Sequence, residues 1–462
     1  MNVYILTEIT KRELDSNLLL SILAAEENGE VLISNMSNLE YLNKKKLLKS
    51  GILHTKSLVH DKRKQDFHLS LVKNNILITS LDEENGLVKK NLKNFAERRF
   101  SEEALKLADK VFCWGRDDLE ILKKKYAEYE EKFILSGAPR TDIWSKKFIS
   151  YWKDENETKE TKDTVLISTN FGLVNGQYTM EEILKREKKA GYFDRCKESK
   201  NEMLQIYEKS KLLIVAFEKL INFLSKELPN IEFHVRPHPR EKVSTWKKMI
   251  KERSNVNISN EGNINSNLCK AKILLHNNCT TAFQASMYEL PIISFSPLDD
   301  ETDNESIANH LGTILKTEAE VKKYIEEIID NKEIIPKNRK KILEQKLYIP
   351  KDVLCTKNII NTWKNLMIDK YNKNNWNLII LNLRVYNFYV GLKKFIFQLF
   401  NSNKNIKIDE KFEKIDTKKI ENKIHKFKKI LNINSNFSVI KIAKRAFLIK
   451  KKTNINIFLG VG

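Results

Sequence analysis

The first 34 residues decide the fold class, and they read MNVYILTEITKRELDSNLLLSILAAEENGEVLIS (residues 1–34). An apolar run at residues 2–7 predicts a strand, and the leucines within residues 13–27 recur at helical spacing. Asn28 and Gly29 predict the end of that helix, and residues 30–34 resume as a strand. A strand, a helix and a second strand in this order are typical of a parallel α/β domain.

The same alternation continues along the chain in two series. The first series places further strands at residues 75–80, 110–114 and 132–135, with helices at 100–108 and 116–129. The second places strands at residues 164–169, 231–236, 271–276 and 291–296, with helices at 197–227 and 280–288. Two such series predict an α/β protein with two doubly wound, Rossmann-like domains that face each other across a cleft.

Composition changes mark the expected domain boundaries. We assign residues 1–150 to the first domain, the polar and charged residues 151–163 to a linker, and residues 164–350 to the second domain. Residues 351–462 form an additional helical, basic C-terminal tail in this interpretation. An aromatic-rich stretch at residues 376–400 opens the last part of the tail.

The net charge of +21 is concentrated in this tail, where residues 401–462 hold 16 lysines and arginines against 5 acidic residues. The charge is that of a solvated lysine-rich surface or of a protein with an anionic partner, namely a membrane face, a polyanionic glycan or nucleic acid. Its concentration in the tail favours attraction of residues 366–462 to an anionic membrane surface. Nucleic acid is suggested by charge alone, because arginine-rich stretches with interleaved aromatic residues are lacking. We therefore expect no nucleic-acid partner.

Cysteine usage and hydropathy indicate the compartment. The five cysteines include no CxxC pair, which is typical of a reducing environment and argues against a structural zinc site. The chain opens directly on a strand-like run without a cleavable signal, and it has no clean apolar stretch long enough to span a membrane. We expect a cytoplasmic protein, at most peripheral at the inner face of the membrane.

The motif Arg236-Pro-His-Pro239 follows a predicted strand directly. Ligands of parallel sheets bind beyond the carboxyl ends of the strands. His238 can donate a hydrogen bond to a phosphate oxygen there, and Arg236 can offset its charge. The alternative is a rigid turn in which the histidine satisfies nearby backbone groups.

A second motif runs from His276 to Pro291 and reads as a strand, a polar turn and a helix. The turn contains Asn278, and Thr280 and Thr281 stand where the helix begins, beside free backbone N–H groups that favour an anion. Glu289 near the far end of the helix is a candidate for hydrogen bonds from a ribose. Alternatively, Thr280 is simply the N-cap of the helix.

The third motif is the acidic run Asp82-Glu83-Glu84, which follows a first-domain strand and precedes Asn85-Gly86. Three adjacent carboxylates cannot all ionise easily when they are partly buried, so one of them can have a raised pKa and act as a general base. The alternative is a solvated acidic loop.

Other polar residues stand at predicted strand ends. Those of the first domain are candidates for binding an anionic ligand in the cleft, or are simple surface charge: Lys11, Arg12, Glu13, Lys56 and Arg140. Asn170 lies in the stretch 169–172, which also flanks the cleft. The acidic run at residues 299–303 has no histidine beside it, so we interpret it as a loop and expect no metal site.

Taken in chain order, these motifs resemble those of the bacterial surface carbohydrate biosynthesis proteins. More distantly, they are similar to GT-B glycosyltransferases that use CMP-activated acidic sugars, namely bacterial sialyltransferases and Kdo transferases. The resemblance covers roughly residues 1–320 and is carried by residues 11–15, 82–84, 137–142, 169–172, 236–239 and 280–281. The sequence departs from the family pattern at Asn85, which separates the acidic run from Gly86. The base therefore stays open among the three carboxylates, with Glu83 or Asp82 favoured.

The resemblance implies a GT-B glycosyltransferase of surface polysaccharide biosynthesis, such as that of capsule, O-antigen or lipopolysaccharide. It implies transfer of an acidic sugar (Kdo or a sialic-type sugar) from a CMP-linked donor to a glycan or lipid-linked glycan. The second domain then holds the donor through Arg236, His238, Pro239, Thr280, Thr281, Glu289, Asn170 and Asn278. The first domain holds the acceptor, and no metal or other cofactor is implied. Two alternatives are a CDP-glycerol-type polyol-phosphate transferase and a nucleotide-sugar epimerase of similar fold.

Overall fold

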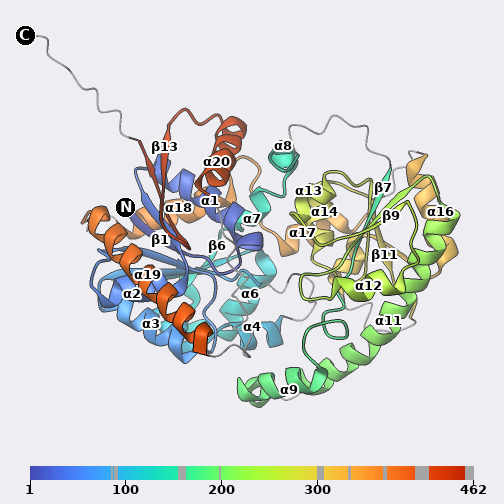
Figure 1. Cartoon of the computed structure of the whole chain (residues 1–462), viewed down its shortest axis with the longest axis horizontal. Coiled ribbons are helices and arrows are strands. Elements are labelled where there is room, and N and C mark those ends of the chain that lie inside the picture. The colour runs from blue at the N-terminus through green and yellow to red at the C-terminus, as the bar shows by residue number, and fades with distance from the viewer. Residues whose placement is uncertain are drawn as a thin grey trace, which may run out of the picture.

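The structure is a computed structural model, which describes residues 1–84, 87, 92–153, 163–196, 199–298, 306–330, 335–367, 372–400 and 416–452. Two lobes lie side by side in Figure 1. The lobe drawn mainly in blue contains the N-terminal residues, and the lobe drawn in green and yellow contains the middle of the chain. The orange and red elements near the C-terminus return to the first lobe, so the first domain is built from both ends of the chain.

An eight-stranded sheet forms the centre of the first lobe. The strands from β2 to β6 run parallel, whereas β14 is antiparallel to both β2 and β13. In sheet order the strands are β13 (Phe437–Ala443), β14 (Ala446–Lys451), β2 (Glu30–Ser34), β1 (Asn2–Leu6), β3 (Gly51–Thr55), β4 (Ile76–Leu81), β5 (Lys110–Cys113) and β6 (Phe133–Leu135).

Helices cover both faces of this sheet because its strands are apolar on both sides. Val3 and Ile5 of β1 join a core with α1 (Thr10–Glu26), α18 (Cys355–Leu366) and α20 (Thr417–Leu431). Tyr4 and Leu6 point the other way, into a core with α2 (Met36–Lys44), α3 (Lys62–Val72) and α19 (Trp376–Phe400). The remaining helices of this lobe are α4 (Lys93–Arg99), α5 (Glu102–Leu107), α6 (Arg116–Lys125), α7 (Pro139–Asp142) and α8 (Ile149–Trp152).

The second lobe contains a six-stranded, wholly parallel sheet. In order, its strands are β12 (Thr313–Leu315), β11 (Ile292–Phe295), β10 (Ile273–His276), β7 (Thr164–Ser168), β8 (Glu232–Arg236) and β9 (Val256–Ile258). One face packs on α11 (Ser199–Glu227), α12 (Val243–Met249) and α16 (Glu318–Ile329), and the other on α13 (Ile264–Leu268) and α14 (Thr281–Met287). Two further helices, α9 (Met180–Lys189) and α10 (Tyr192–Arg195), lie between β7 and α11 in the chain.

After the second sheet the chain crosses back to the first lobe through α17 (Arg339–Lys346) and α18. The carboxylate of Asp142 accepts the backbone N–H groups of Cys355 and Thr356, both at 2.8 Å, and thereby anchors the start of α18. At the other end of α18, the indole of Trp363 donates to Thr79 of β4 at 3.0 Å. The chain thus joins the two lobes a second time, and α18, where the crossing segment ends, is anchored in the first lobe.

The described part of the tail confirms the expected helices and adds a β-hairpin that the sequence analysis did not anticipate. Helix α20 packs on α1 and α8, and the hairpin β13–β14 extends the first sheet beyond β2. The residues 416–452 are thus an integral part of the first domain. None of the helices in the described ranges combines the length and the apolar character needed to cross a bilayer.

The fold prediction is confirmed: two parallel α/β domains face each other, and each predicted strand lies within two residues of an observed one. Five strands of the described residues were given no bounds in the prediction, namely β3, β9, β12, β13 and β14. The first helix begins at Thr10 rather than at residue 13, and the helix expected at 116–129 ends at Lys125. Asn85, Gly86, most of the linker (154–162) and the acidic run at 299–303 lie outside the described residues.

Candidate active site in the cleft between the domains

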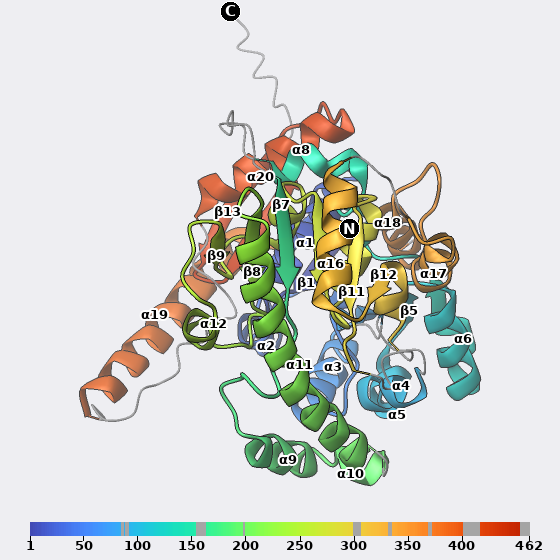
Figure 2. The same ribbon diagram turned by 90° about the vertical axis from the view of Figure 1, so that its right-hand side faces the viewer.

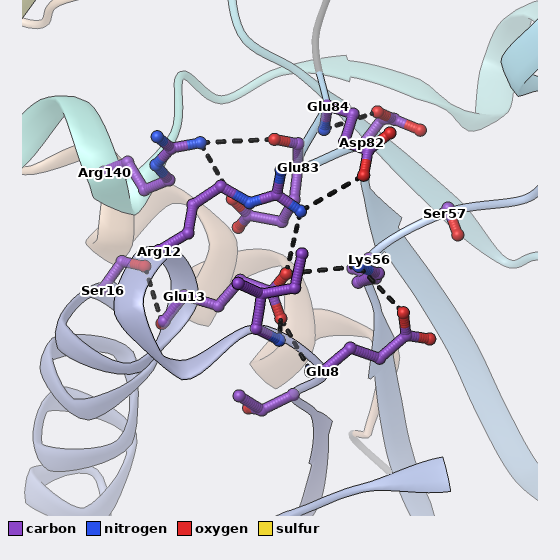
Figure 3. Close-up of polar contacts among 12 residues, drawn as sticks. Glu8, Arg12, Glu13, Ser16, Lys56, Ser57, Asp82, Glu83, Glu84 and Arg140 are labelled. Atoms are coloured by element: carbon purple, nitrogen blue, oxygen red, sulfur yellow. Dashed lines mark hydrogen bonds and ion pairs between the residues drawn. The ribbon is translucent and has the colours of Figure 1, made fainter. Parts of the chain in front are cut away.

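The first wall of the cleft is built where three adjacent parallel strands end. Glu8 and Arg12 follow β1, Lys56 follows β3, and the acidic residues 82–84 follow β4. The loops are tied together, since the backbone N–H of Glu83 donates to the backbone oxygen of Lys56 at 3.2 Å. Figure 3 shows the side chains of this charged cluster converging from the three strand ends.

Glu13 is the fully buried centre of the charged cluster. Its carboxylate accepts the backbone N–H groups of Glu8 and Ile9 at 2.8 and 3.1 Å, and it pairs with Arg12 at 3.1 Å and Lys56 at 3.2 Å. Lys56 also pairs with Glu8 at 2.9 Å. Glu13 therefore holds Arg12 and Lys56 in place. It supports the cations of the site and is itself too deeply buried for the ligand contact that we expected.

The three consecutive carboxylates have different surroundings. Asp82 is buried and bound to Arg99 at 2.9 Å; burial raises its pKa, and Arg99 opposes the rise. Burial also raises the pKa of Glu84, but Arg99 and Arg12 outweigh it and hold the pKa at about 2. Burial raises the pKa of Glu83 to about 7, despite the opposing charge of Arg140. The pKa of Glu83 is therefore much closer to neutrality than that of Glu84.

Arg140 lies above this loop and begins the short helix α7 together with Pro139. Its guanidinium stands 5.5 Å from the ring centre of Trp114 and 5.2 Å from that of Trp144. The indole of Trp114 in turn donates to the backbone oxygen of Asp82 at 2.9 Å. The two tryptophans thus hold both Arg140 and the acidic loop, a support that the sequence analysis missed.

The second wall contains the loop after β8, with the motif Arg236-Pro-His-Pro239. A buried carboxylate that the sequence analysis did not single out, Glu241, organises this loop. Glu241 accepts the backbone N–H of His238 at 3.0 Å and the indole N–H of Trp246 at 2.8 Å. It also accepts from Thr169 at 2.8 Å and from the backbone N–H of Phe171 at 3.1 Å, both in the loop after β7. One carboxylate therefore fixes two loops of the second domain.

His238 is half-buried and lines the cleft. Its Nδ1 accepts the backbone N–H of Arg240 at 3.1 Å, which leaves Nε2 as the hydrogen-bond donor of the neutral ring. Burial lowers its pKa to about 4, with contributions from Arg240 and from Arg12 on the opposite wall. His238 is therefore a neutral donor at physiological pH.

Arg236 also lines the cleft, but its guanidinium is already bound within the second domain. It donates to the backbone oxygens of Glu261 and Gly262 at 2.5 and 2.8 Å and to the side chain of Asn267 at 2.8 Å. These bonds hold the loop after β9 in place. The geometry favours a positioning role over the direct phosphate contact that we expected.

The polar turn before α14 is the third element of the second wall. Thr280 is exposed to the cleft and its hydroxyl does not cap the helix, contrary to the capping alternative. Thr281 is buried, 3.2 Å from the hydroxyl of Ser168. Asn170 donates to the backbone oxygen of Asn278 at 3.1 Å and so joins this turn to the loop after β7. Both threonines line the cleft, but the hydroxyl of Thr280 is exposed whereas that of Thr281 is already paired with Ser168.

The two walls enclose a cleft of about 3270 Å³. His238 and Thr280 do not stand at adjacent strands: β7 lies between β8 and β10, which separates their strand ends by about 10 Å. Among the described residues, twelve lysines and arginines and nine acidic residues line the cleft, and the cations include Lys11, Arg12, Lys56, Arg140, Arg240, Lys444 and Arg445. Lys444 and Arg445 form the turn of the unanticipated hairpin, so the C-terminal segment also contributes to the cleft.

The remaining predictions concern Glu289, Pro239 and the absence of a metal ion. Glu289 lies at the far end of α14, exposed, ion-paired with Lys146, and outside the lining of the cleft. This placement gives its expected contact with a ribose no support. Within the described residues, no group of three His, Cys, Asp or Glu side chains is arranged to hold a metal ion. Pro239 is exposed at the edge of the cleft, beside His238.

Comparisons by sequence find no matching family model and no matching characterised protein. Solved structures do match along most of the chain. A protein from Listeria monocytogenes assigned as a UDP-N-acetylglucosamine 2-epimerase has 11% identity and a TM-score of 0.50, covering 80% of this chain and 97% of its own. At this identity the likeness establishes the fold, and the fold is of the GT-B type.

Two other solved structures are more distant in shape. The complex of S. aureus MnaA with UDP has 13% identity and a TM-score of 0.46, covering 81% of this chain and 98% of its own. The wall teichoic acid polymerase TagF has 12% identity and a TM-score of 0.43, covering 69% of this chain and 73% of its own.

Proposed function

We propose that this protein is a GT-B glycosyltransferase of surface polysaccharide biosynthesis that uses a nucleotide-activated sugar. One observation carries the proposal. A buried carboxyl group, Glu83, with a pKa near 7 stands in one wall of the cleft, and a neutral imidazole donor, His238, stands in the other. A base on one side and a phosphate-binding donor on the other are what transfer of a sugar to a hydroxyl group requires.

Glu83 is the general base in this proposal. Its pKa lies near the working pH, where a base combines a sufficient ionised fraction with proton affinity. Glu84 is too weak a base because its pKa is about 2, and Asp82 is bound to Arg99. Glu83 would accept the proton of the attacking acceptor hydroxyl while the bond from the sugar to the phosphate breaks.

The donor nucleotide lies along the carboxyl ends of β8, β7 and β10. His238 donates through Nε2 to the departing phosphate, and the exposed hydroxyl of Thr280, on the other side of β7, contacts the adjoining part of the donor. The separation of their strand ends, about 10 Å, suits a nucleotide phosphate and sugar placed between them better than direct contact. Asn170 and Asn278 line the space between them, Arg236 and Glu241 position the loops, and Glu289 is left out.

We further propose that the transferred sugar is acidic and that the donor is a CMP-sugar of the Kdo or sialic type. The support is local: three arginines, Arg12, Arg140 and Arg240, line the cleft close to the base and the imidazole. Such a lining favours a carboxylate-bearing sugar and an anionic acceptor glycan over neutral ones. The proposal includes no metal ion or other cofactor.

A ligand screen followed by product analysis tests the function. CMP-Kdo, CMP-sialic acid, CDP-glycerol and UDP-N-acetylglucosamine are compared for thermal stabilisation of the full chain, which reports binding. The stabilising compound is then incubated with and without a glycan acceptor. Nucleotide release that depends on acceptor and equals product formation supports a transferase. Conversion of the donor sugar without an acceptor would instead identify an epimerase, and stabilisation by CDP-glycerol alone a polyol-phosphate transferase.

A further inference from the structure

Helix α19 is attached to the first domain by one side only. Trp376, Ile379 and Leu383 are buried in the core that α2, α3 and β1 share. The ring of Tyr386 stacks on Tyr41 of α2 at 4.1 Å. These contacts fix the orientation of the helix, and Figure 2 shows its C-terminal half projecting away from the body of the protein.

The opposite side of α19 is apolar and exposed. The exposed fractions of eight side chains range from 42% to 74%, and we call this set the apolar stripe: Leu378, Leu381, Val385, Phe388, Tyr389, Leu392, Phe395 and Ile396. At the helical rotation of about 100° per residue, all eight fall within an arc of about 120°. The arc lies opposite the buried residues, so the stripe is a continuous apolar face that no described part of the protein covers.

The charges on this helix have one sign. Residues 372–400 contain no aspartate or glutamate, and Arg384 and Lys393 stand on the two opposite flanks of the apolar stripe. The ammonium group of Lys393 lies 4.6 Å from the centre of the Tyr389 ring. An apolar, aromatic stripe with a cation on each flank is the pattern of a helix that lies in the plane of a membrane interface.

We propose that α19 binds an anionic lipid membrane, with its apolar stripe in the interfacial region and its flanking cations on the lipid headgroups. Burial of the exposed leucine, valine and phenylalanine side chains supplies the apolar part of the binding, and Arg384 and Lys393 supply the electrostatic part. Charge argues for lipid over a second copy of this chain, because a second copy carries the same net charge of +21.

Vesicle sedimentation of the full chain tests the proposal. Vesicles of phosphatidylcholine are compared with vesicles that also contain phosphatidylglycerol. We expect the protein to sediment with the anionic vesicles, and the variant Val385→Glu to lower its partition coefficient at least about tenfold. The matched control is Val215→Glu, since Val215 is 45% exposed on α11, outside the cleft lining, and the substitution changes the net charge equally.

Three outcomes would overturn the proposal. The first is a wild-type protein that stays in the supernatant with anionic vesicles. The second is an equal loss in both variants, because net charge alone then drives binding. The third is a wild-type dimer in sedimentation velocity that Val385→Glu converts to a monomer without any vesicle binding, which makes the stripe an interface between copies. Circular dichroism of both variants checks that the fold is retained.

Discussion

Arg140 contacts Glu83 twice: its Nη1 donates to the backbone oxygen of Glu83 at 3.2 Å and to the carboxylate at 3.4 Å. Even with this cation beside it, burial raises the pKa of Glu83 to about 7. The pair therefore keeps the carboxyl group in place while leaving it close to half-ionised at neutral pH. The properties of this one group lead to two separate predictions.

The first prediction concerns the pH dependence of transfer. With Glu83 as the base, kcat/KM should rise about tenfold per pH unit below pH 7 and level off above it, because only the ionised form accepts a proton. His238, with a pKa of about 4, stays neutral across this range. Glu83→Gln should lower kcat/KM by about 10²–10⁴-fold and remove the rising limb. Initial rates measured between pH 5 and 9 (a range of about two units on each side of 7) check this.

Glu84→Gln is the matched control for the pH profile. Glu84 is an anion throughout this range because its pKa is about 2, so the variant should keep a limb near pH 7. If Glu84→Gln lost the rising limb and Glu83→Gln kept it, the base would be Glu84 and the assignment of Glu83 would be wrong.

The second prediction concerns stability. The pKa of Glu83 is 4.5 in the unfolded chain and about 7 in the fold, so the folded state holds the proton more tightly. Ionisation therefore costs stability as pH rises from about 4.5 to 7, and the cost is absent below the unfolded pKa. Glu83→Gln removes this cost and should therefore raise the free energy of unfolding above pH 7. The gain is at most about 3 kcal/mol, because Arg140 loses its ion-pair partner in the variant and this loss offsets part of the gain. Urea titrations at pH 4 and pH 8 (about half a unit below and about one unit above this window) should show little gain and a clear gain, respectively.

The third prediction concerns Glu241 as a positioning residue. A glutamine retains one acceptor oxygen for the four groups that donate to Glu241 at 2.8–3.1 Å. Glu241→Gln should therefore destabilise the protein by about 1–3 kcal/mol for each donor left without a partner. It should also weaken donor binding, because the loops that carry His238 and Asn170 lose their common anchor. Denaturant titration and ligand-induced thermal shifts measure the two effects.

An exposed glutamate provides the control for Glu241. Glu344 on α17 has a side chain that is 67% exposed, and Glu344→Gln should change stability by less than about 0.5 kcal/mol. If both substitutions were equally mild, Glu241 would not hold the two loops.

Much of the fold follows from local patterns in the sequence. Apolar strands such as β1 and β4 give a clear signal in the sequence. Asn28, with φ of 58°, follows the end of α1 where the Asn-Gly pair predicted it. The short edge strands β9 and β12 have three residues each, too few to show a pattern. The hairpin β13–β14 pairs with β2, some 400 residues away, and no local signal reports such a partner.

The site shows the same division between local and long-range information. The strand ends placed Glu83 and His238 in one cleft, as their positions after predicted strands indicated. Glu241 looks like a surface charge in the sequence, because its donors come from residues 169, 171, 175, 238 and 246 and meet only in the fold. The expected contact of Glu289 with a ribose has no support in the structure, because α14 is short and ends away from the cleft.

The last prediction compares two glycine-to-alanine substitutions. Gly137 has φ of 70°, and an added Cβ would lie 2.3 Å from the sulfur of Cys355 and 2.5 Å from the backbone oxygen of Tyr348. Both contacts belong to the segment that crosses back from the second domain. Gly137→Ala should therefore destabilise the protein by at least about 2 kcal/mol, through backbone strain and through displacement of the start of α18.

Gly391 provides the opposite case within the same chain. It lies inside α19, and an added Cβ would meet nothing within 4 Å. Gly391→Ala should leave the fold intact and stabilise the helix by up to about 1 kcal/mol, because alanine loses less backbone entropy than glycine. Urea denaturation of both variants measures the difference. Equal free energies of unfolding would show that the crossing segment is not packed tightly against Gly137 and that this contact does not anchor the start of α18.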